Sequence, residues 1–319
     1  MDILIVGCGV AGLSCGIRLI EAGHRTQIWA RDLPPNTTSN IAAAIWYPYA
    51  AYPQELVGRW AAVTYAEFIR LLEQPGIGVA MREGSEIFPT PVDDPWWRDA
   101  LPGFRRATPA ELPEGYVDGY SFAAPVIEMP VYLTYLMRRF QSLGGSIQVR
   151  ALESLDAALA ASDVVVNCAG LGARELVGDR SLFAIRGQVV RVAQVGVERF
   201  WLDDYGPRGL AYIVPRSQDI ILGGTAQEGD ERLAPDPATA QAIVERCVAL
   251  EPRLRDAPIL EHRVGLRPGR PSVRLEAERP APGKLLVHNY GHGGAGVTLS
   301  WGCADEVLKI CLDPTITSA

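Results

Sequence analysis

The apolar residues near the start of the chain follow a strand, helix, strand pattern. Residues 3–6 form a short apolar run, Leu13, Ile17 and Ile20 recur at helical spacing, and residues 26–29 form a second β-type run. Further along, residues 130–143 have the pattern of a helix and residues 163–167 that of a short buried strand. Because strand and helix signals alternate at both ends of the chain, we predict an α/β layer fold.

The middle of the chain has a different pattern. Residues 46–124 are rich in proline and aromatic side chains, and residues 182–222 carry β-type runs such as 188–192 and 212–214. A further helix begins at Asp236 and Pro237, where an N-cap acceptor precedes a proline suited to the first turn, and it ends at Pro252. We predict a second domain with an antiparallel sheet, threaded through the first.

The composition is that of a globular protein and limits the partners. Of the 319 residues, 48% are hydrophobic and 21% are charged, with a net charge of −7. Phosphate binding needs a dense positive footprint, so we expect neither nucleic acid nor a membrane as a partner. The six cysteines contain no CxxC pair, which predicts buried free thiols, with no zinc site and no disulfide framework. The first residues lack a basic leader, so we expect a cytoplasmic protein.

A glycine-rich turn, GCGVAG, follows the first predicted strand and opens the first predicted helix. In this context Gly7 permits the tight turn, Gly9 lets a pyrophosphate approach the backbone, and Gly12 allows the helix to pack closely on the strand. The N-terminus of the helix then faces the phosphates with unpaired N–H groups. The motif therefore predicts a bound dinucleotide.

The second predicted strand leads into Arg31 and Asp32. An acidic group at this position accepts hydrogen bonds from ribose hydroxyls, as FAD or NAD requires. The guanidinium of Arg31 could instead bind the 2′-phosphate of NADP. A surface ion pair between the two side chains is a third interpretation.

A second glycine-rich segment, residues 288–298, stands directly before the last predicted helix. Its glycines let a planar ring approach bare backbone, and the helix N-terminus can stabilise negative charge on that ring. Reduced flavin carries such a charge and reduced nicotinamide does not, so the segment favours FAD. An alternative interpretation of this segment is a metal site, because His288 and His292 lie four residues apart. No carboxylate ligand stands near them in the sequence.

Three arginines follow one another in the segment RVGLRPGRP, at positions 263, 267 and 270. A guanidinium held by a restricted backbone suits a bidentate bond to a substrate carboxylate. By residue type alone, each of Arg263, Arg267 and Arg270 is equally a candidate for a surface ion pair.

Across its length the sequence resembles the D-amino acid oxidase family. The resemblance is carried by residues 7–12, 37–46, 165–170, 186–188, 212–215, 265–268 with 270–271, and the highly specific HNYGHGG segment at 288–294. With the motifs above, we predict a Rossmann-like FAD-binding domain of residues 1–45, 125–184 and 260–319. Interleaved with it is an α+β substrate-binding domain of residues 46–124 and 185–259, built on an antiparallel sheet.

The resemblance also implies the residues of the site. FAD is expected to contact the following residues: Gly7, Gly9, Val10, Ala11, Gly12, Arg31, Asp32, Thr38, Ser39, Ala43, Ala44, Ile45, Leu152, Ala169, Gly293, Gly294, Ala295, Gly296, Val297 and Thr298. Arg267 matches the arginine that pairs with the substrate α-carboxylate, and the hydroxyl of Tyr212 joins the same carboxylate. The carbonyl of Gly294 accepts from the α-amino group.

Two positions depart from mammalian members of the family. Arg208 replaces a tyrosine of the active-site loop, and Tyr47 replaces a glutamine. Relatives that oxidise D-aspartate tend to carry serine at the position of Gly294, so glycine favours neutral D-amino acids, while Arg208 leaves acidic ones open. We expect both Tyr47 and Arg208 to contact the substrate.

The predicted activity is FAD-dependent oxidation of a D-amino acid by oxygen, giving a 2-oxo acid, ammonia and hydrogen peroxide. The substrate hydride passes to flavin N5, and we expect no protein acid or base at the Cα proton, only orientation by the binding residues. A D-aspartate, glycine or sarcosine oxidase of the same fold, an NADP-dependent reductase and a non-catalytic flavin-binding module are the alternatives. A homodimer is one option that the sequence leaves open.

Overall fold

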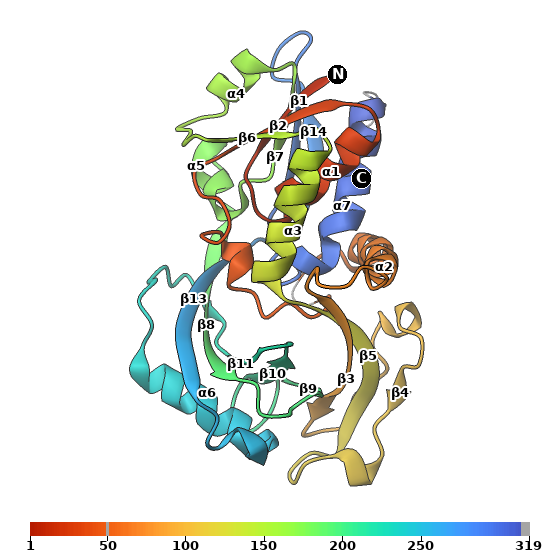
Figure 1. Cartoon of the computed structure of the whole chain (residues 1–319), viewed down its shortest axis with the longest axis vertical. Helices are drawn as coiled ribbons and strands as arrows, with labels where there is room; N and C mark the ends of the chain where they lie inside the picture. The colour runs from red at the N-terminus through yellow and green to blue at the C-terminus, as the bar shows by residue number, and fades with distance from the viewer. Residues whose placement is uncertain (49–50, 314–319) are drawn as a thin grey trace.

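The computed structural model describes residues 1–48 and 51–313, which form two sheets lying one above the other in Figure 1. Within the described residues, the first sheet has the strand order β14-β15-β7-β1-β2-β6. Its strands pair in parallel except for β14, which is antiparallel to β15. The strands are β1 (Asp2–Val6), β2 (Arg25–Ala30), β6 (Ser146–Val149), β7 (Val164–Asn167), β14 (Arg274–Glu278) and β15 (Leu285–Tyr290).

Helices cover both faces of this sheet because its strands are apolar on both sides. Ile3 and Ile5 belong to a core shared with α1 (Val10–Glu21), α3 (Met129–Ser142) and α7 (Gly296–Leu312). The alternate residues Leu4 and Val6 pack on the other face, against α4 (Asp156–Ala161) and the region of α5 (Ala173–Leu176). Strand β7 and helix α3 confirm the two elements predicted at 163–167 and 130–143.

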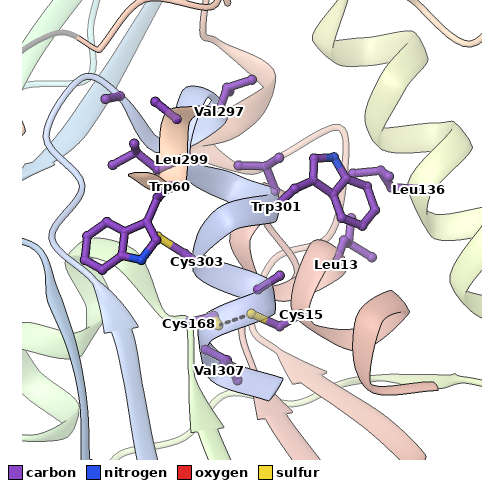
Figure 2. Packing of buried hydrophobic residues seen from close by; sticks show 14 of the residues in the cluster. Leu13, Cys15, Trp60, Leu136, Cys168, Val297, Leu299, Trp301, Cys303 and Val307 are labelled. Atoms are coloured by element: carbon purple, nitrogen blue, oxygen red, sulfur yellow. Dashed lines mark hydrogen bonds between the residues drawn. The ribbon is translucent and has the colours of Figure 1, made fainter. Parts of the chain in front are cut away.

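The core of the first face is continuous between helices and sheet, as Figure 2 shows. Trp301 of α7 lies beside Leu13 and Leu136, while Leu299 and Cys303 of the same helix lie toward Trp60. All six cysteines are buried free thiols, as predicted. No helix of the described residues is both long enough and apolar enough to cross a membrane.

The second sheet is the lower one in Figure 1. Among the described residues its order is β12-β8-β11-β10-β9-β3-β5-β4, with β13 along the other edge of β8. The strands are β3 (Val79–Phe88), β4 (Arg105–Arg106), β5 (Asp118–Ile127), β8 (Phe183–Ala193), β9 (Phe200–Asp203), β10 (Ala211–Pro215), β11 (Asp219–Gly223), β12 (Gln227–Glu228) and β13 (Ile259–Gly269). Helix α6 (Pro237–Leu250) packs on it, and the side chain of Asp236 caps that helix as predicted, accepting from the Thr239 amide at 2.7 Å.

The second sheet and one helix outside it differ from the sequence-based prediction at three points. Strand β3 pairs in parallel with β9, so the sheet is mixed and not purely antiparallel. These two strands come from separate stretches of the chain and no hairpin joins them, so no turn signal could reveal their direction. Strand β13 pairs with β8 along its length, although the predicted boundary at 260 assigns it to the first domain. The domain boundaries themselves stay a prediction.

Helix α2 (Gln54–Leu71) is the third correction, because no helix was predicted within residues 46–124. It packs on α7 so closely that a Cβ at Gly302 would lie 2.2 Å from the carbonyl oxygen of Trp60. The helix thus links the segment after residue 48 to the first layer of the fold.

Candidate active site

A continuous cavity of about 1110 Å³ is lined by residues of both sheets. One end lies at the carboxyl ends of β1 and β2, where Gly7, Arg31 and Asp32 line it. The other end lies on a face of the second sheet, where Tyr212 and Arg267 line it. A ligand with two chemically different ends therefore has room to connect the two sheets.

The glycine-rich turn has the geometry that its pattern predicts. Gly7 has φ +112°, and a Cβ there would lie 2.4 Å from the Cys168 carbonyl oxygen. A Cβ at Gly12 would lie 2.0 Å from the Gly7 carbonyl oxygen, so Gly12 serves close packing and does not itself line the cavity. Gly9 is the N-cap of α1 and supplies no capping side chain, while the Ser39 hydroxyl accepts from the Val10 amide at 3.1 Å. The first turn thus presents backbone N–H groups to the cavity, as binding of a pyrophosphate requires.

Arg31 and Asp32 line the cavity and also form an ion pair with each other at 2.8 Å. Both side chains are largely exposed. Leu152 and Arg150 line the same end, and the Arg150 guanidinium stacks 3.9 Å above the Trp29 ring. Sequence reasoning did not single out Arg150, since a lone arginine after a strand carries no motif.

The segment from Thr38 to Ile45 forms one wall of the cavity, and the predicted Thr38, Ser39, Ala43, Ala44 and Ile45 all line it. Ala44 has φ +55°, a conformation that alanine rarely adopts. It is held there because its carbonyl accepts from the Ile127 amide at 2.7 Å and Ile45 bridges to Val126. The backbone of this wall is therefore fixed before any ligand binds.

The N-terminus of α7 forms the opposite wall. Gly293, Gly294, Gly296, Val297 and Thr298 line the cavity, whereas Ala295 is fully buried behind it. Ala295 is the N-cap and offers no capping side chain, so the first amides of α7 are available to a ligand. The Thr298 hydroxyl donates to the Tyr47 carbonyl at 3.0 Å, which ties the two walls together.

The two histidines of the glycine-rich segment have separate partners. His292 Nε2 lies 2.9 Å from Asn289 Oδ1, and burial lowers the pKa of His292 to about 4, so its ring is neutral. His288 Nε2 lies 3.5 Å from Glu278. Within residues 1–48 and 51–313, no three His, Cys, Asp or Glu side chains gather as a metal site would need.

These features fit FAD. The glycine turn and the N-terminus of α1 suit the pyrophosphate, and the exposed Asp32 can accept from ribose hydroxyls. The N-terminus of α7 can stabilise a negatively charged ring. Asn40 supports the same fit: it lines the cavity, is 3% exposed, and its Nδ2 has no hydrogen-bond acceptor among the described residues.

Strand register places the residues of the other end on one face of the second sheet. Directly paired residues point to the same side of a sheet, and residues two apart along a strand do so as well. Following the pairing across the strands gives one row: Glu86 of β3, Leu202 of β9, Tyr212 of β10, Gly223 of β11, Val189 of β8 and Arg263 of β13. Arg267 stands four residues beyond Arg263 and therefore projects from the same face.

Arg267 differs from its two neighbouring arginines. Arg263 pairs with Glu261 at 2.7 Å and Arg270 pairs with Asp179 at 3.1 Å. Among the described residues Arg267 has no such ion pair; its Nη1 donates to the Thr225 carbonyl at 3.0 Å, and its guanidinium also bonds the Tyr212 hydroxyl. The half-buried guanidinium thus has no carboxylate in direct contact within the described part of the chain, and the charge of Asp204 acts on it only from a distance.

Two glycines make room for this arrangement. A Cβ at Gly187 would lie 2.4 Å from Arg267 Nη1, and a Cβ at Gly223 would lie 1.9 Å from the Tyr212 ring. The guanidinium and the phenol therefore lie flat over the strands. Burial raises the pKa of Tyr212 despite the nearby charge of Arg267, so the hydroxyl remains a hydrogen-bond donor.

Tyr47 lines the cavity, and its hydroxyl donates to Glu86 Oε1 at 2.7 Å. Burial raises the pKa of Glu86 to about 8 and that of the cavity-lining Asp204 to about 6. Sequence reasoning missed both carboxyl groups. A charged residue directly before the apolar end of β3, and a second aspartate directly after β9, were the available signals.

The Arg208 side chain is exposed and does not line the cavity. Its charge acts on Asp203, whose pKa it lowers against the stronger raising effect of burial. A contact between Arg208 and the substrate therefore stays a prediction.

Three comparisons with known proteins agree with the geometry. The DAO family model, described as FAD dependent oxidoreductase, matches residues 2–310. The chain is 57% identical to a D-amino-acid oxidase of Rubrobacter xylanophilus, over 96% of this chain and 94% of that protein, and 43% identical to one of Dictyostelium discoideum, over 97% and 91%. A glycine oxidase structure from Geobacillus kaustophilus has the same fold, with a TM-score of 0.78 at 20% identity over 97% of this chain and 93% of that one.

Proposed function

The chain belongs to the DAO family of FAD-dependent oxidoreductases, and we propose that it is a D-amino acid oxidase that binds its substrate through Arg267. The observation that carries this proposal is the guanidinium of Arg267, with no carboxylate in direct contact among the described residues, beside Tyr212, at the end of a cavity whose other end fits FAD. The products are a 2-oxo acid, ammonia and hydrogen peroxide.

The predicted cofactor contacts that line the cavity would hold FAD. These are Gly7, Gly9, Val10, Ala11, Arg31, Asp32, Thr38, Ser39, Ala43, Ala44, Ile45, Leu152, Ala169, Gly293, Gly294, Gly296, Val297 and Thr298. Bound FAD would supply the two-electron acceptor for the reaction. The amides at the start of α7 would stabilise the negative charge that develops there.

The chain itself contributes orientation. Arg267 pairs with the α-carboxylate, the Tyr212 hydroxyl donates to the same group, and the Gly294 carbonyl accepts from the α-amino group. With carboxylate and amine both fixed, one enantiomer alone presents its Cα–H to the acceptor. The hydride leaves Cα while the amine lone pair forms the iminium, so no side chain needs to remove the Cα hydrogen as a proton.

The preference for neutral D-amino acids rests on Gly294 and stays a proposal. Arg208 does not line the cavity, so oxidation of acidic substrates through Arg208 is not part of this proposal. The NADP-dependent reductase is not proposed, because Arg31 is already paired with Asp32 and the family is FAD-dependent.

Replacing Arg267 tests the proposal. Arg267→Ala should retain FAD and lower kcat/KM for D-alanine about 10²- to 10⁴-fold, mainly through KM, because a bidentate charged pair is lost. The matched control is Arg263→Ala, on the same strand and face but already paired with Glu261, and its kcat/KM should stay within a few-fold of wild type. Wild-type turnover by Arg267→Ala, measured as oxygen uptake, would refute the assignment.

A further inference from the structure

Asp204 directly follows β9 and faces the substrate end of the cavity. Leu202, two residues earlier, pairs with Tyr212, so the alternation of the strand directs residue 204 to the same face. Asp204 lines the cavity, and its charge acts on Arg267, Tyr47 and Glu86. It therefore stands within electrostatic reach of the carboxylate-binding arginine.

The two neighbouring aspartates have different surroundings. Asp203 points to the other side, where its carboxylate accepts from the Tyr116 hydroxyl and from the amides of Tyr205 and Gly206. The Asp204 carboxylate has no hydrogen bond and no ion pair among the residues that the structure describes. A half-buried carboxylate without a direct partner is costly: burial raises the pKa of Asp204, and the more distant charge of Arg267 offsets this only in part. A cation in the cavity would offset the rest of that cost.

The charges around this end favour one class of side chain. When a substrate α-carboxylate neutralises Arg267, the remaining charge is that of Asp204, with Glu86 behind it at 3% exposure and its Oε2 unpaired among the described residues. The phenols of Tyr47 and Tyr212 also line this end, each with a pKa above its usual value. Arg263 lines the cavity too, but its charge is offset by its ion pair with Glu261. The remaining uncompensated charge is therefore negative, so an acidic side chain is repelled.

Resting on the proposed oxidase function, we propose that Asp204 is a specificity-determining residue that selects D-amino acids with a cationic side chain, such as D-lysine and D-arginine, over acidic ones. The α-amino group is already accepted by the Gly294 carbonyl, which leaves Asp204 for the side chain. Asp204 is not needed for the oxidation of an apolar substrate.

The test compares substrates of matched length with the FAD-loaded enzyme. Oxygen uptake is measured with D-lysine, D-norleucine and D-glutamate at about pH 9, where Asp204 is ionised and the lysine side chain is still largely charged. Asp204→Asn should lower the ratio of kcat/KM for D-lysine to that for D-norleucine about tenfold and should raise kcat/KM for D-glutamate. The ratio carries the test, because Asp204→Asn also removes a charge that acts on Arg267 and so bears on the absolute kcat/KM for every substrate.

Two further variants control for folding and for distant charge. Asp204→Glu restores the carboxylate and should restore the wild-type ratio of kcat/KM for D-lysine to that for D-norleucine. Glu261→Gln removes a carboxylate that lines the same cavity but pairs with Arg263, and it should leave the substrate ratio at the wild-type value.

Three results would overturn the inference. One is an equal loss with all substrates in Asp204→Asn, which means that Asp204 binds the α-ammonium group or only supports the fold. Another is a wild-type preference for D-glutamate over D-lysine. The third is an unchanged D-lysine ratio in Asp204→Asn. Failure of the wild-type enzyme to oxidise D-alanine and D-norleucine is a distinct result and would overturn the proposed function itself.

Discussion

At the scale of single residues, the carboxyl group of Glu86 is the clearest case of a perturbed titration. Its side chain is 3% exposed, and burial raises its pKa to about 8, although the hydrogen bond from Tyr47 opposes the shift. The folded pKa therefore lies above the ordinary value of 4.5, so folding favours the protonated form. The contribution of Glu86 to the free energy of unfolding is fully present below the ordinary pKa of 4.5. It is lost as the pH rises through about 8.

Glu86→Gln should remove this pH dependence, because glutamine is an uncharged group of the same shape. Between about pH 5 and pH 9 the free energy of unfolding of the wild type should fall by up to about 5 kcal/mol more than that of the variant. Urea unfolding at three pH values measures the difference. Glu83→Gln on the same strand is the control, since Glu83 is exposed, and it should keep the wild-type profile. Parallel profiles for wild type and Glu86→Gln would show that Glu86 is ionised in the folded protein.

Site residues that belong to sequence motifs could be predicted. Site residues that only strand pairing brings together could not. Arg267 and Tyr212, which both line the cavity, could be predicted because their segments carry recognisable patterns. Glu86 meets this site only through the pairing of β3 with β9, between segments more than one hundred residues apart, and Asp204 only through the pairing of β9 with β10. Arg208 was assigned from its place in a loop, and the loop turns that side chain outward.

At the scale of elements, local patterns specified the first layer well. The glycine turn, α1 and the start of α7 follow from short-range spacing, since each needs only a strand end, a few glycines and a helical repeat. Helix α2 had a helical signal too, in Val57, Trp60, Ala61, Phe68 and Leu71, all buried. The surrounding prolines and aromatic residues concealed it, because their composition suggested strands.

The relative direction of the strands in the second sheet could not be predicted from the sequence. The apolar alternation of β3 and β9 is the same for parallel and antiparallel pairing, and only the path of the intervening chain decides between them. The length of β13 was likewise hidden, since most of its residues are half-buried and its sequence has no regular alternation of apolar and polar side chains.

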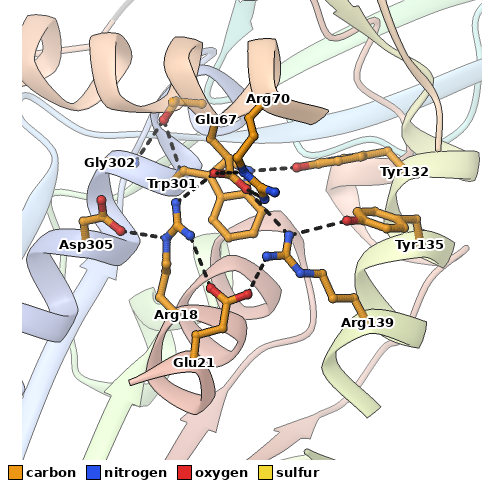
Figure 3. Close-up of polar contacts among 11 residues, drawn as sticks. Arg18, Glu21, Glu67, Arg70, Tyr132, Tyr135, Arg139, Trp301, Gly302 and Asp305 are labelled. Atoms are coloured by element: carbon orange, nitrogen blue, oxygen red, sulfur yellow. Dashed lines mark hydrogen bonds and ion pairs between the residues drawn. The ribbon is translucent and has the colours of Figure 1, made fainter. Parts of the chain in front are cut away.

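At the scale of the whole molecule, an ion network joins the helices that cover the first sheet, as Figure 3 shows. Glu67 of α2 is 7% exposed and contacts Arg18 of α1 at 3.2 Å, Arg70 at 2.5 Å and Arg139 of α3 at 3.6 Å. The Arg18 and Arg139 guanidinium groups also lie over the Trp301 ring of α7. The carboxylate of Glu67 thus links α1, α2 and α3.

Glu67→Gln should destabilise the protein by about 3 kcal/mol, because it leaves arginines packed together without their shared anion. Thermal unfolding of the FAD-loaded enzyme measures this effect. Glu306→Gln is the control, since Glu306 pairs only with the exposed Lys309 among the ion pairs described, and it should cost less than about 0.5 kcal/mol. The kcat/KM for D-alanine should stay unchanged in both variants, because neither residue lines the cavity. An unfolding temperature of Glu67→Gln equal to that of the control would contradict this role.

The central claim is that one cavity holds FAD at one end and a D-amino acid carboxylate on Arg267 at the other. Flavin absorbance under anaerobic conditions tests it most directly. The account predicts a yellow protein that D-alanine bleaches and L-alanine does not, with Arg267→Ala equally yellow but unbleached at the same D-alanine concentration. A colourless protein, or equal bleaching by both enantiomers, would contradict it.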